Sequence, residues 1–236
     1  MPNTQDINRT ARQQIEENWM DQYQSAQALW IHDGNPKRPH ARLTAGDHSS
    51  GFFNSKLIIA QEMSLREAAR DLLVLFSMSG NDLASIDGVV GPQTGATLLA
   101  EYISQQIRTI TQKDCFHASP AKHKEGNMKS MIFNEEELAL LHGKVVLLCE
   151  DVSTTGESVG LTADAITAAG GIIYPCILVL VNRSGLSEIN EREIISLIDR
   201  YMPKWAPNEE CPLCKAGSEA LRPKEGNNWA LLNAIY

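Results

Sequence analysis

Apolar residues in the first third of the chain recur at helical spacing. Within residues 1–30 they are spaced on an otherwise polar segment, which predicts an amphipathic helix that lies on another part of the protein. A capping-box pattern, a serine followed three positions later by a glutamate, predicts a second helix over residues 64–78. Between the two helices, the apolar pairs and triplets at 52–53 and 57–59 predict short strands.

From residue 86 onward, short apolar runs alternate with turns and helical segments. Strands are expected at 86–90, 144–149 and 172–181, turns at 91–95 and 151–156, and helices at 96–110 and 158–169. A polar insertion at 113–137 interrupts this order. Continuous apolar strands joined by helices predict an α/β fold with a central, mainly parallel sheet that is flanked by helices.

The pattern divides the chain of 236 residues into three parts. Residues 1–40 are expected to form an N-terminal helical segment, 41–200 the α/β domain, and 201–236 a C-terminal extension. One core with appendages agrees with the usual domain length of about 100–200 residues.

Composition and charge exclude several classes of protein. The 21 Lys and Arg residues against 29 Asp and Glu residues give a formal net charge of −8, so a nonspecific nucleic-acid binder is not expected. The chain has no run of about 18 apolar residues, so no membrane-spanning helix is expected. Five cysteines and no leader pattern in residues 1–6 predict a protein of the reducing cytoplasm.

The most informative segment joins the strand at 144–149 to the helix at 158–169. Two carboxylates, Glu150 and Asp151, follow the strand, and small hydroxyl residues and a glycine come next. Backbone N–H groups at such a helix N-terminus suit a phosphate, and the carboxylates suit ribose hydroxyls with Mg²⁺ nearby. The alternative is a strand end whose acidic pair only caps the next helix.

This segment resembles the binding motif for 5-phosphoribosyl-1-pyrophosphate (PRPP) of type I phosphoribosyltransferases. Residues 43–54, 89–96 and 182–185 are similar to segments of orotate phosphoribosyltransferases in particular, in the same order along the chain. The resemblance covers about residues 40–200. It implies the type I fold with a small hood near residues 40–60, Mg²⁺ as the cofactor, PRPP and orotate as substrates, and a homodimer.

The resemblance also implies roles for single residues. Glu150 and Asp151 would bind the ribose hydroxyls, Arg183 the orotate carboxylate, and Phe52 and Phe53 the orotate ring. The other substrate-binding residues that it implies are Gln93 and Thr94 for pyrophosphate, and Ser153, Thr154, Thr155, Gly156, Glu157 and Ser158, with 154–158 around the 5-phosphate. For Arg183, a solvated arginine in a turn is the alternative.

In this family a flexible loop acts across the dimer interface and brings basic residues over the departing pyrophosphate. Residues 117–127 occupy its place, and the resemblance implies that Lys122 and Lys124 act with Asp151 in catalysis. The alternative is an ordinary exposed basic loop.

The chain departs from the family pattern in two respects, one in this loop and one in the hood. An alanine and a serine at 118–119 stand where the family has an arginine–lysine pair, and Thr44 is nearest to the place of the hood lysine.

Orotate phosphoribosyltransferase activity is the leading hypothesis. The alternatives are transfer to a purine or another base, and a non-catalytic regulator that binds PRPP or a nucleotide.

Cys211 and Cys214 have the spacing of half a zinc site. A complete structural site needs four ligands, so a His or Cys elsewhere, or the same pair from a second subunit, would have to complete it. A reduced structural turn is the alternative. A redox pair fits less well, because the motif follows a proline-containing loop and does not open a helix after a strand. The basic residues at 222–224, further along the extension, have no assigned role.

Overall fold

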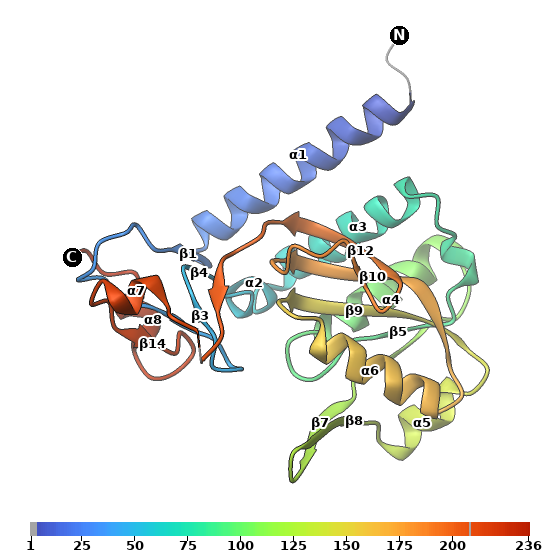
Figure 1. The fold of residues 1–236 in the computed structure, drawn as a ribbon. Coiled ribbons are helices and arrows are strands. Elements are labelled where there is room, and N and C mark those ends of the chain that lie inside the picture. Colours follow the sequence, from blue (N-terminus) through green and yellow to red (C-terminus); the bar gives the residue numbers. More distant parts are fainter. Residues whose placement is uncertain (1–3, 208) are drawn as a thin grey trace.

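A six-stranded sheet forms the centre of the protein in the computed structural model, which describes residues 4–207 and 209–236 (Figure 1). Its strands, in spatial order, are β11 (Glu188–Ile189), β12 (Arg192–Asp199), β10 (Ile172–Asn182), β9 (Val145–Ser153), β5 (Gly88–Val90) and β6 (Phe116–Ala118). All neighbouring pairs are parallel except β11 with β12 at one edge. The predicted fold class, an α/β fold with a mainly parallel sheet, is confirmed.

Helices cover both faces of this sheet and create two apolar cores. The helices beside the larger core are α1 (Thr4–Ser25), α3 (Glu62–Met78) and α4 (Thr97–Thr111), and those beside the smaller core are α5 (Glu135–Leu141) and α6 (Glu157–Ala168). Strand β9 shows why both faces need cover: Leu147 and Cys149 belong to the larger core, Val146 and Leu148 to the smaller one. Alternate side chains of a strand point to opposite faces, so an all-apolar strand requires two apolar layers.

A second, smaller sheet lies beside the main domain, and we call it the hood sheet. Its strands, in spatial order, are β13 (Lys204–Trp205), β3 (His48–Ser49), β2 (His40–Arg42) and β14 (Ala220–Leu221). Next to them are the paired strands β1 (Leu29–Ile31) and β4 (Gly51–Phe53) and the short helices α2 (Lys56–Ile59), α7 (Pro212–Lys215) and α8 (Asn228–Leu232). The C-terminal extension therefore pairs with β2 and β3, which lie about 155 to 180 residues earlier in the chain (Figure 1).

The predicted polar insertion at 113–137 is largely ordered structure. After β6 it forms a hairpin arm of β7 (Ala121–Glu125) and β8 (Met128–Ile132), which projects from the domain below α6 in Figure 1. A true capping box, in which the side chains of Asn134 and Glu137 each accept from the other's backbone N–H, then opens α5.

Four local predictions were wrong or incomplete. The first helix ends at Ser25, because Gln27 adopts a positive φ of 51°, and the chain then continues into β1. Residues 57–59 form part of α2 instead of a strand. Helix α3 begins at Glu62 with Gln61 as its N-cap, so the serine and glutamate of the predicted capping box lie inside the helix.

The fourth difference concerns the predicted turn at 151–156. Strand β9 continues to Ser153, so both carboxylates, Glu150 and Asp151, are strand residues.

The short 3₁₀ helix Leu83–Ser85 and strand β12 were not predicted. Residues 1–3 of the predicted N-terminal segment lie outside the described residues. Among the described residues, no helix is long and apolar enough to cross a membrane.

Candidate active site

A cavity of about 530 Å³ lies where the carboxyl ends of β9 and β10 meet the hood segment and the hairpin arm. Ligands of open α/β sheets bind at this edge. The predicted site residues that line the cavity are Phe52, Phe53, Lys122, Lys124, Glu150, Asp151, Ser153, Thr154, Thr155, Gly156, Glu157, Ser158 and Arg183. These predicted residues come from four separate parts of the chain and line one cavity.

The turn between β9 and α6 shapes the end of the cavity that is closest to the helix. Gly156 is the N-cap of α6 with a φ of 78°, and a Cβ atom there would lie 3.0 Å from the side chain of Ile189. Both facts favour glycine. Thr155 Oγ1 accepts from the backbone N–H of Glu157 at 3.3 Å. Ser153 Oγ is buried and has no hydrogen-bond partner within the described part of the chain. This end can therefore offer hydroxyl and backbone donors to an anion at a helix N-terminus.

Glu150 and Asp151 place two carboxylates side by side on the cavity wall. Glu150 is 7% exposed, and its Oε1 accepts from the backbone N–H of Asp151 at 3.1 Å. Burial, followed by the charge of Asp151, raises the pKa of Glu150 well above its usual value, and nearby Lys122 partly opposes this shift. The charged form of Glu150 is therefore disfavoured in the cavity wall, and hydroxyl donors or a cation would stabilise it.

Gln93 and Thr94 lie in the turn after β5 and do not line the cavity. The Gln93 Nε2 atom donates to the carbonyl of Ser119 at 2.9 Å, and its backbone N–H donates to Pro120. The peptide bond between Gln93 and Thr94 is cis. The same turn reaches the site through Gly95, which packs against Asp151. The structure therefore places the turn beside the acidic pair but directs the Gln93 side chain toward the start of the hairpin arm.

Arg183 follows β10 and is almost completely buried, with 2% of its surface exposed. Its Nη1 donates to the carbonyl of Gly51 at 3.0 Å and its Nη2 to Ser49 Oγ at 2.6 Å. Burial lowers the pKa of Arg183 to about 10, so the guanidinium remains charged at neutral pH. Its buried Nε has no hydrogen-bond partner among the residues described. The alternative of a solvated turn arginine is wrong. Of the five N–H donors of the guanidinium, the bonds to Gly51 and Ser49 use two, so donors remain for a ligand in the cavity that Arg183 lines.

The cavity has a different charge balance from the whole chain. Five Lys or Arg side chains and four carboxylates line it, in a protein of net charge −8. Lys122 and Lys124 come from β7 and are exposed. Lys129 of β8 pairs with Glu157 at 2.6 Å. The lysines of the hairpin arm thus line the same cavity as the hydroxyl and backbone donors of the β9–α6 turn.

Sequence reasoning missed two of the cavity cations, Lys129 and Lys224. Lys224 lies 6.0 Å from the centroid of the Phe52 ring, which places this part of the C-terminal extension at the cavity wall that Phe52 forms. The available signals were the basic run at 222–224 and the lysine that follows the predicted loop. Neither signal indicates proximity to the site, because both depend on how distant segments pack.

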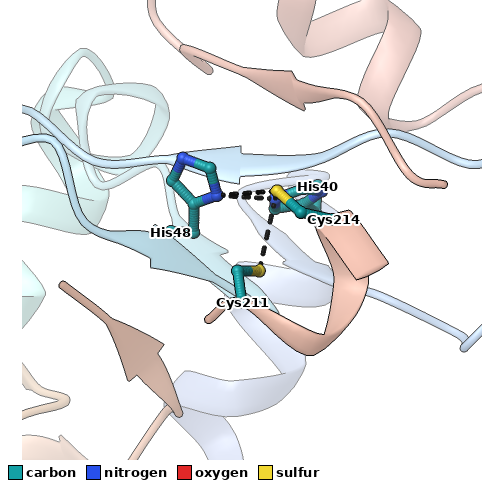
Figure 2. Close-up of side chains that lie close together, drawn as sticks. All are labelled: His40, His48, Cys211 and Cys214. Carbon is teal, nitrogen blue, oxygen red and sulfur yellow. Dashed lines mark hydrogen bonds between the residues drawn. The ribbon is translucent and has the colours of Figure 1, made fainter. Parts of the chain in front are cut away.

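Cys211 and Cys214 lie outside this cavity. They cluster with His40 and His48, and the ligand atoms of all four residues are within 4.8 Å of one another (Figure 2). The sequence predicted that a His or Cys elsewhere must complete a zinc site but did not identify these histidines. The available signal was their position in a Gly-, Pro- and His-rich segment at 33–48.

Comparison with known proteins agrees with this geometry. The family model described as "Phosphoribosyl transferase domain" matches residues 61–204. The chain is 29% identical over 187 residues to an orotate phosphoribosyltransferase of Heliobacterium modesticaldum, a match that covers 78% of this chain and 88% of that protein. It is 28% identical over 197 residues to one of Acidithiobacillus ferrooxidans, covering 83% and 93%.

Solved structures show the same fold. A crystal structure of orotate phosphoribosyltransferase from Aeropyrum pernix superposes with a TM-score of 0.51 at 22% identity, covering 75% of this chain and 91% of that chain. One from Mycobacterium tuberculosis H37Rv superposes with a TM-score of 0.52 at 15% identity, covering 80% and 95%. At these identities the likeness concerns the fold alone.

Proposed function

This chain belongs to the phosphoribosyl transferase domain family, and from that premise we propose that it transfers the phosphoribosyl group of PRPP to orotate, giving orotidine 5′-monophosphate and pyrophosphate. One observation supports this most strongly. An acidic pair of buried Glu150 and half-buried Asp151, a glycine-capped helix N-terminus and a buried arginine surround a single cavity.

PRPP would bind along the β9–α6 segment. Its 5-phosphate would accept from the donors at residues 154–158, at the positive end of the helix dipole. Its ribose hydroxyls would donate to Glu150 and Asp151. Hydrogen bonds from the ribose hydroxyls to the ionised carboxylates would lower the pKa of Glu150 again. PRPP binding would therefore offset part of the free-energy cost of burying the charged form of Glu150.

Orotate would lie between the paired aromatic residues and Arg183. Phe52 and Phe53 line the cavity and belong to β4, whose first residue, Gly51, accepts from Arg183. An Arg183 N–H group that is not used by Gly51 or Ser49 would donate to the carboxylate of orotate, a charge-assisted hydrogen bond that purines and uracil cannot accept in the same way. This contact favours orotate over the alternative bases.

The acidic pair also fits a magnesium ion. Mg²⁺ is usually held by one or two carboxylates together with substrate phosphates, and Asp151 with Glu150 offers hard oxygen ligands beside the expected pyrophosphate. When bound, Mg²⁺ would supply neutralisation of negative charge on pyrophosphate.

In the transfer, the bond between ribose C1 and the pyrophosphate oxygen breaks, and a bond between C1 and the orotate nitrogen forms. Lys122 and Lys124 would stabilise the charge that develops on pyrophosphate as it leaves. Glu150 and Asp151 would hold the ribose so that C1 faces the base. Positioning and charge stabilisation suffice for this chemistry, and no residue needs to act as a strong base.

We further propose a homodimer that works in the cytoplasm. The five cysteines are all free, which suits a reducing compartment. In this structure Lys122 lines the cavity of its own chain, whereas the family resemblance implies a loop that acts on the partner's site. Mixing the variants Lys122→Ala and Asp151→Asn, each of reduced activity by itself, separates the two arrangements. Partial recovery of activity indicates a loop shared between subunits, and no recovery indicates that each chain completes its own site.

A panel of bases tests the proposed reaction. The purified chain with PRPP and Mg²⁺ should release pyrophosphate with orotate and not with uracil, hypoxanthine, adenine or xanthine. Release of pyrophosphate with a purine and not with orotate would support the alternative, a phosphoribosyltransferase that acts on another base. PRPP binding without release for any base would identify a regulator, which the alanine–serine pair at 118–119 favours because it removes two loop cations.

A further inference from the structure

We propose that His40, His48, Cys211 and Cys214 bind one zinc ion that fastens the C-terminal extension to the hood sheet. The four residues come from three separate places: β2, β3 and the start of α7. Figure 2 shows their side chains converging on one point. Neither substrate binding nor the transfer reaction uses them, so the proposal is independent of the proposed function.

The distances between ligand atoms agree with a tetrahedral site. Zn–S bonds of about 2.3 Å and Zn–N bonds of about 2.0–2.1 Å imply N···S edges of about 3.6 Å and an N···N edge of about 3.4 Å. His40 Nε2 lies 3.6 Å from Cys211 Sγ and 3.5 Å from Cys214 Sγ. His48 Nδ1 lies 3.2 Å from Cys214 Sγ and 3.0 Å from His40 Nε2.

A second contact orients His40 for this role. Ser218 donates its hydroxyl hydrogen to the carbonyl of Arg38 at 2.6 Å, so its oxygen can only accept from His40 Nδ1, 2.9 Å away. The proton of His40 is therefore on Nδ1, and the Nε2 lone pair points into the cluster. Metal-bound histidines are held in this way by a polar group on their other nitrogen. Ser218 is a positioning residue for the metal.

The donor set identifies the class of ion. Two thiolates and two imidazoles in a tetrahedral arrangement suit Zn²⁺, whereas Mg²⁺ and Ca²⁺ require oxygen ligands. With four protein ligands the coordination sphere is complete, so the site is structural and leaves no position for a substrate.

The location of the cluster lets a bound zinc ion fix the position of a loop that lines the substrate cavity. His40 and His48 stand on the two strands that flank residues 43–47, and Leu43, Thr44, Ala45 and Asp47 of this loop line the substrate cavity. Ser49, next to His48, accepts from Arg183. A metal at the cluster would hold the base of this loop and the segment that carries Lys224 in one rigid unit.

Metal analysis of the full-length protein tests the proposal. The protein is produced with zinc supplied, passed over a chelating resin, and its zinc content measured by mass spectrometry. We expect one zinc per chain, and a loss of zinc in Cys211→Ser, Cys214→Ser and His48→Ala. Cys115→Ala removes a buried thiol outside the cluster and should keep one zinc. Ser218→Ala should weaken zinc affinity by roughly 10–100-fold in competition with a coloured chelator.

Cobalt substitution keeps the test informative if a variant folds poorly. Wild-type protein stripped of zinc and loaded with Co²⁺ should show the visible bands of a tetrahedral ion and a thiolate-to-metal charge-transfer band. Cys214 is exposed, and replacing it in Cys214→Ser removes one of the two thiolate ligands, so the charge-transfer band should be weaker. A wild-type protein with neither zinc nor these bands overturns the proposal. So does a full zinc content in Cys211→Ser and Cys214→Ser, or a disulfide between Cys211 and Cys214 in the protein as isolated from cells. None of these measurements requires PRPP or orotate.

Discussion

The carboxylate of Asp151 lies directly against Gly95, where an added Cβ atom would be 2.6 Å from Asp151 Cγ. Gly95 follows β5, and Asp151 lies near the carboxyl end of the neighbouring parallel strand β9. The turn after β5 therefore forms one wall of the space in which the carboxylate stands. The position of Asp151 depends on a residue about 55 positions earlier that carries no side chain.

Asp151→Asn tests the proposed ribose contact directly. The amide has nearly the same volume but neither the charge nor the second acceptor oxygen, so kcat/KM should fall at least about tenfold, a loss of roughly 1.4 kcal/mol of transition-state stabilisation. Steady-state kinetics with PRPP and orotate measures this. Unchanged kinetics would refute the ribose role.

Gly95→Ala tests whether position matters as well as charge. The new methyl group must displace the Asp151 carboxylate, so we expect kcat/KM to fall about as much as in Asp151→Asn, with a destabilisation of roughly 1–3 kcal/mol from overpacking. Gly160→Ala is the matched control, because its Cβ would lie 3.4 Å from Asn190 Nδ2. A variant of Gly95 with normal activity would show that the carboxylate can move freely.

The buried Glu150 predicts a pH-dependent stability of the ligand-free protein. Its pKa is raised in the folded state, so the folded protein holds this proton more tightly than the unfolded chain. Stability should therefore decrease as the pH rises from about 4.3, the unfolded value, through the raised pKa. Glu150→Gln removes this dependence, and its advantage in Tm over the wild type should grow between pH 5 and pH 8.

Thermal melts at several pH values measure the difference. The exposed Glu193→Gln on β12 serves as the control, since it removes a carboxylate without relieving burial. A Tm difference between Glu150→Gln and the wild type that stays constant with pH would contradict the prediction.

Arg183→Lys should separate the two substrates. Lysine keeps a positive charge but cannot reproduce the guanidinium contacts to Ser49 and Gly51 while also donating to orotate. We expect the KM for orotate to rise about 10–100-fold, the range for loss of a hydrogen bond to a charged group, and the KM for PRPP to change much less. Equal changes for both substrates would indicate that Arg183 only supports the fold of the hood.

Lys122→Ala should lower kcat more than it changes the KM for orotate. The lysine is exposed, lies near Glu150 and would act on the leaving pyrophosphate, so we expect at least about a tenfold loss of kcat. Lys129→Ala is the control on the same hairpin arm. Lys129 is already paired with Glu157 in an exposed salt bridge, whose loss should change stability by less than about 1 kcal/mol.

Long periodic segments were predicted well because their pattern is local. The strand expected at 172–181 is β10, and the helices expected at 96–110 and 158–169 are α4 and α6, each within a residue or two. Short segments were predicted poorly. Residues 57–59 suit either a strand or a helical turn, and the start of α3 depends on the extended backbone of Gln61. Such choices are decided by the surrounding chain.

The sequence by itself determined the family, the α/β fold and the β9–α6 segment, because the carboxylates, hydroxyls and glycine of that segment are contiguous. Only the tertiary structure decided which atoms of Arg183 remain for a ligand, and that His40 and His48 complete the cysteine pair. The reason is that these contacts join residues 132 to 174 positions apart, and burial and hydrogen bonding across such separations arise only when distant segments of the chain pack together. The local sequence shows which functional groups are present, and the packing of distant segments decides which of these groups come together in a site.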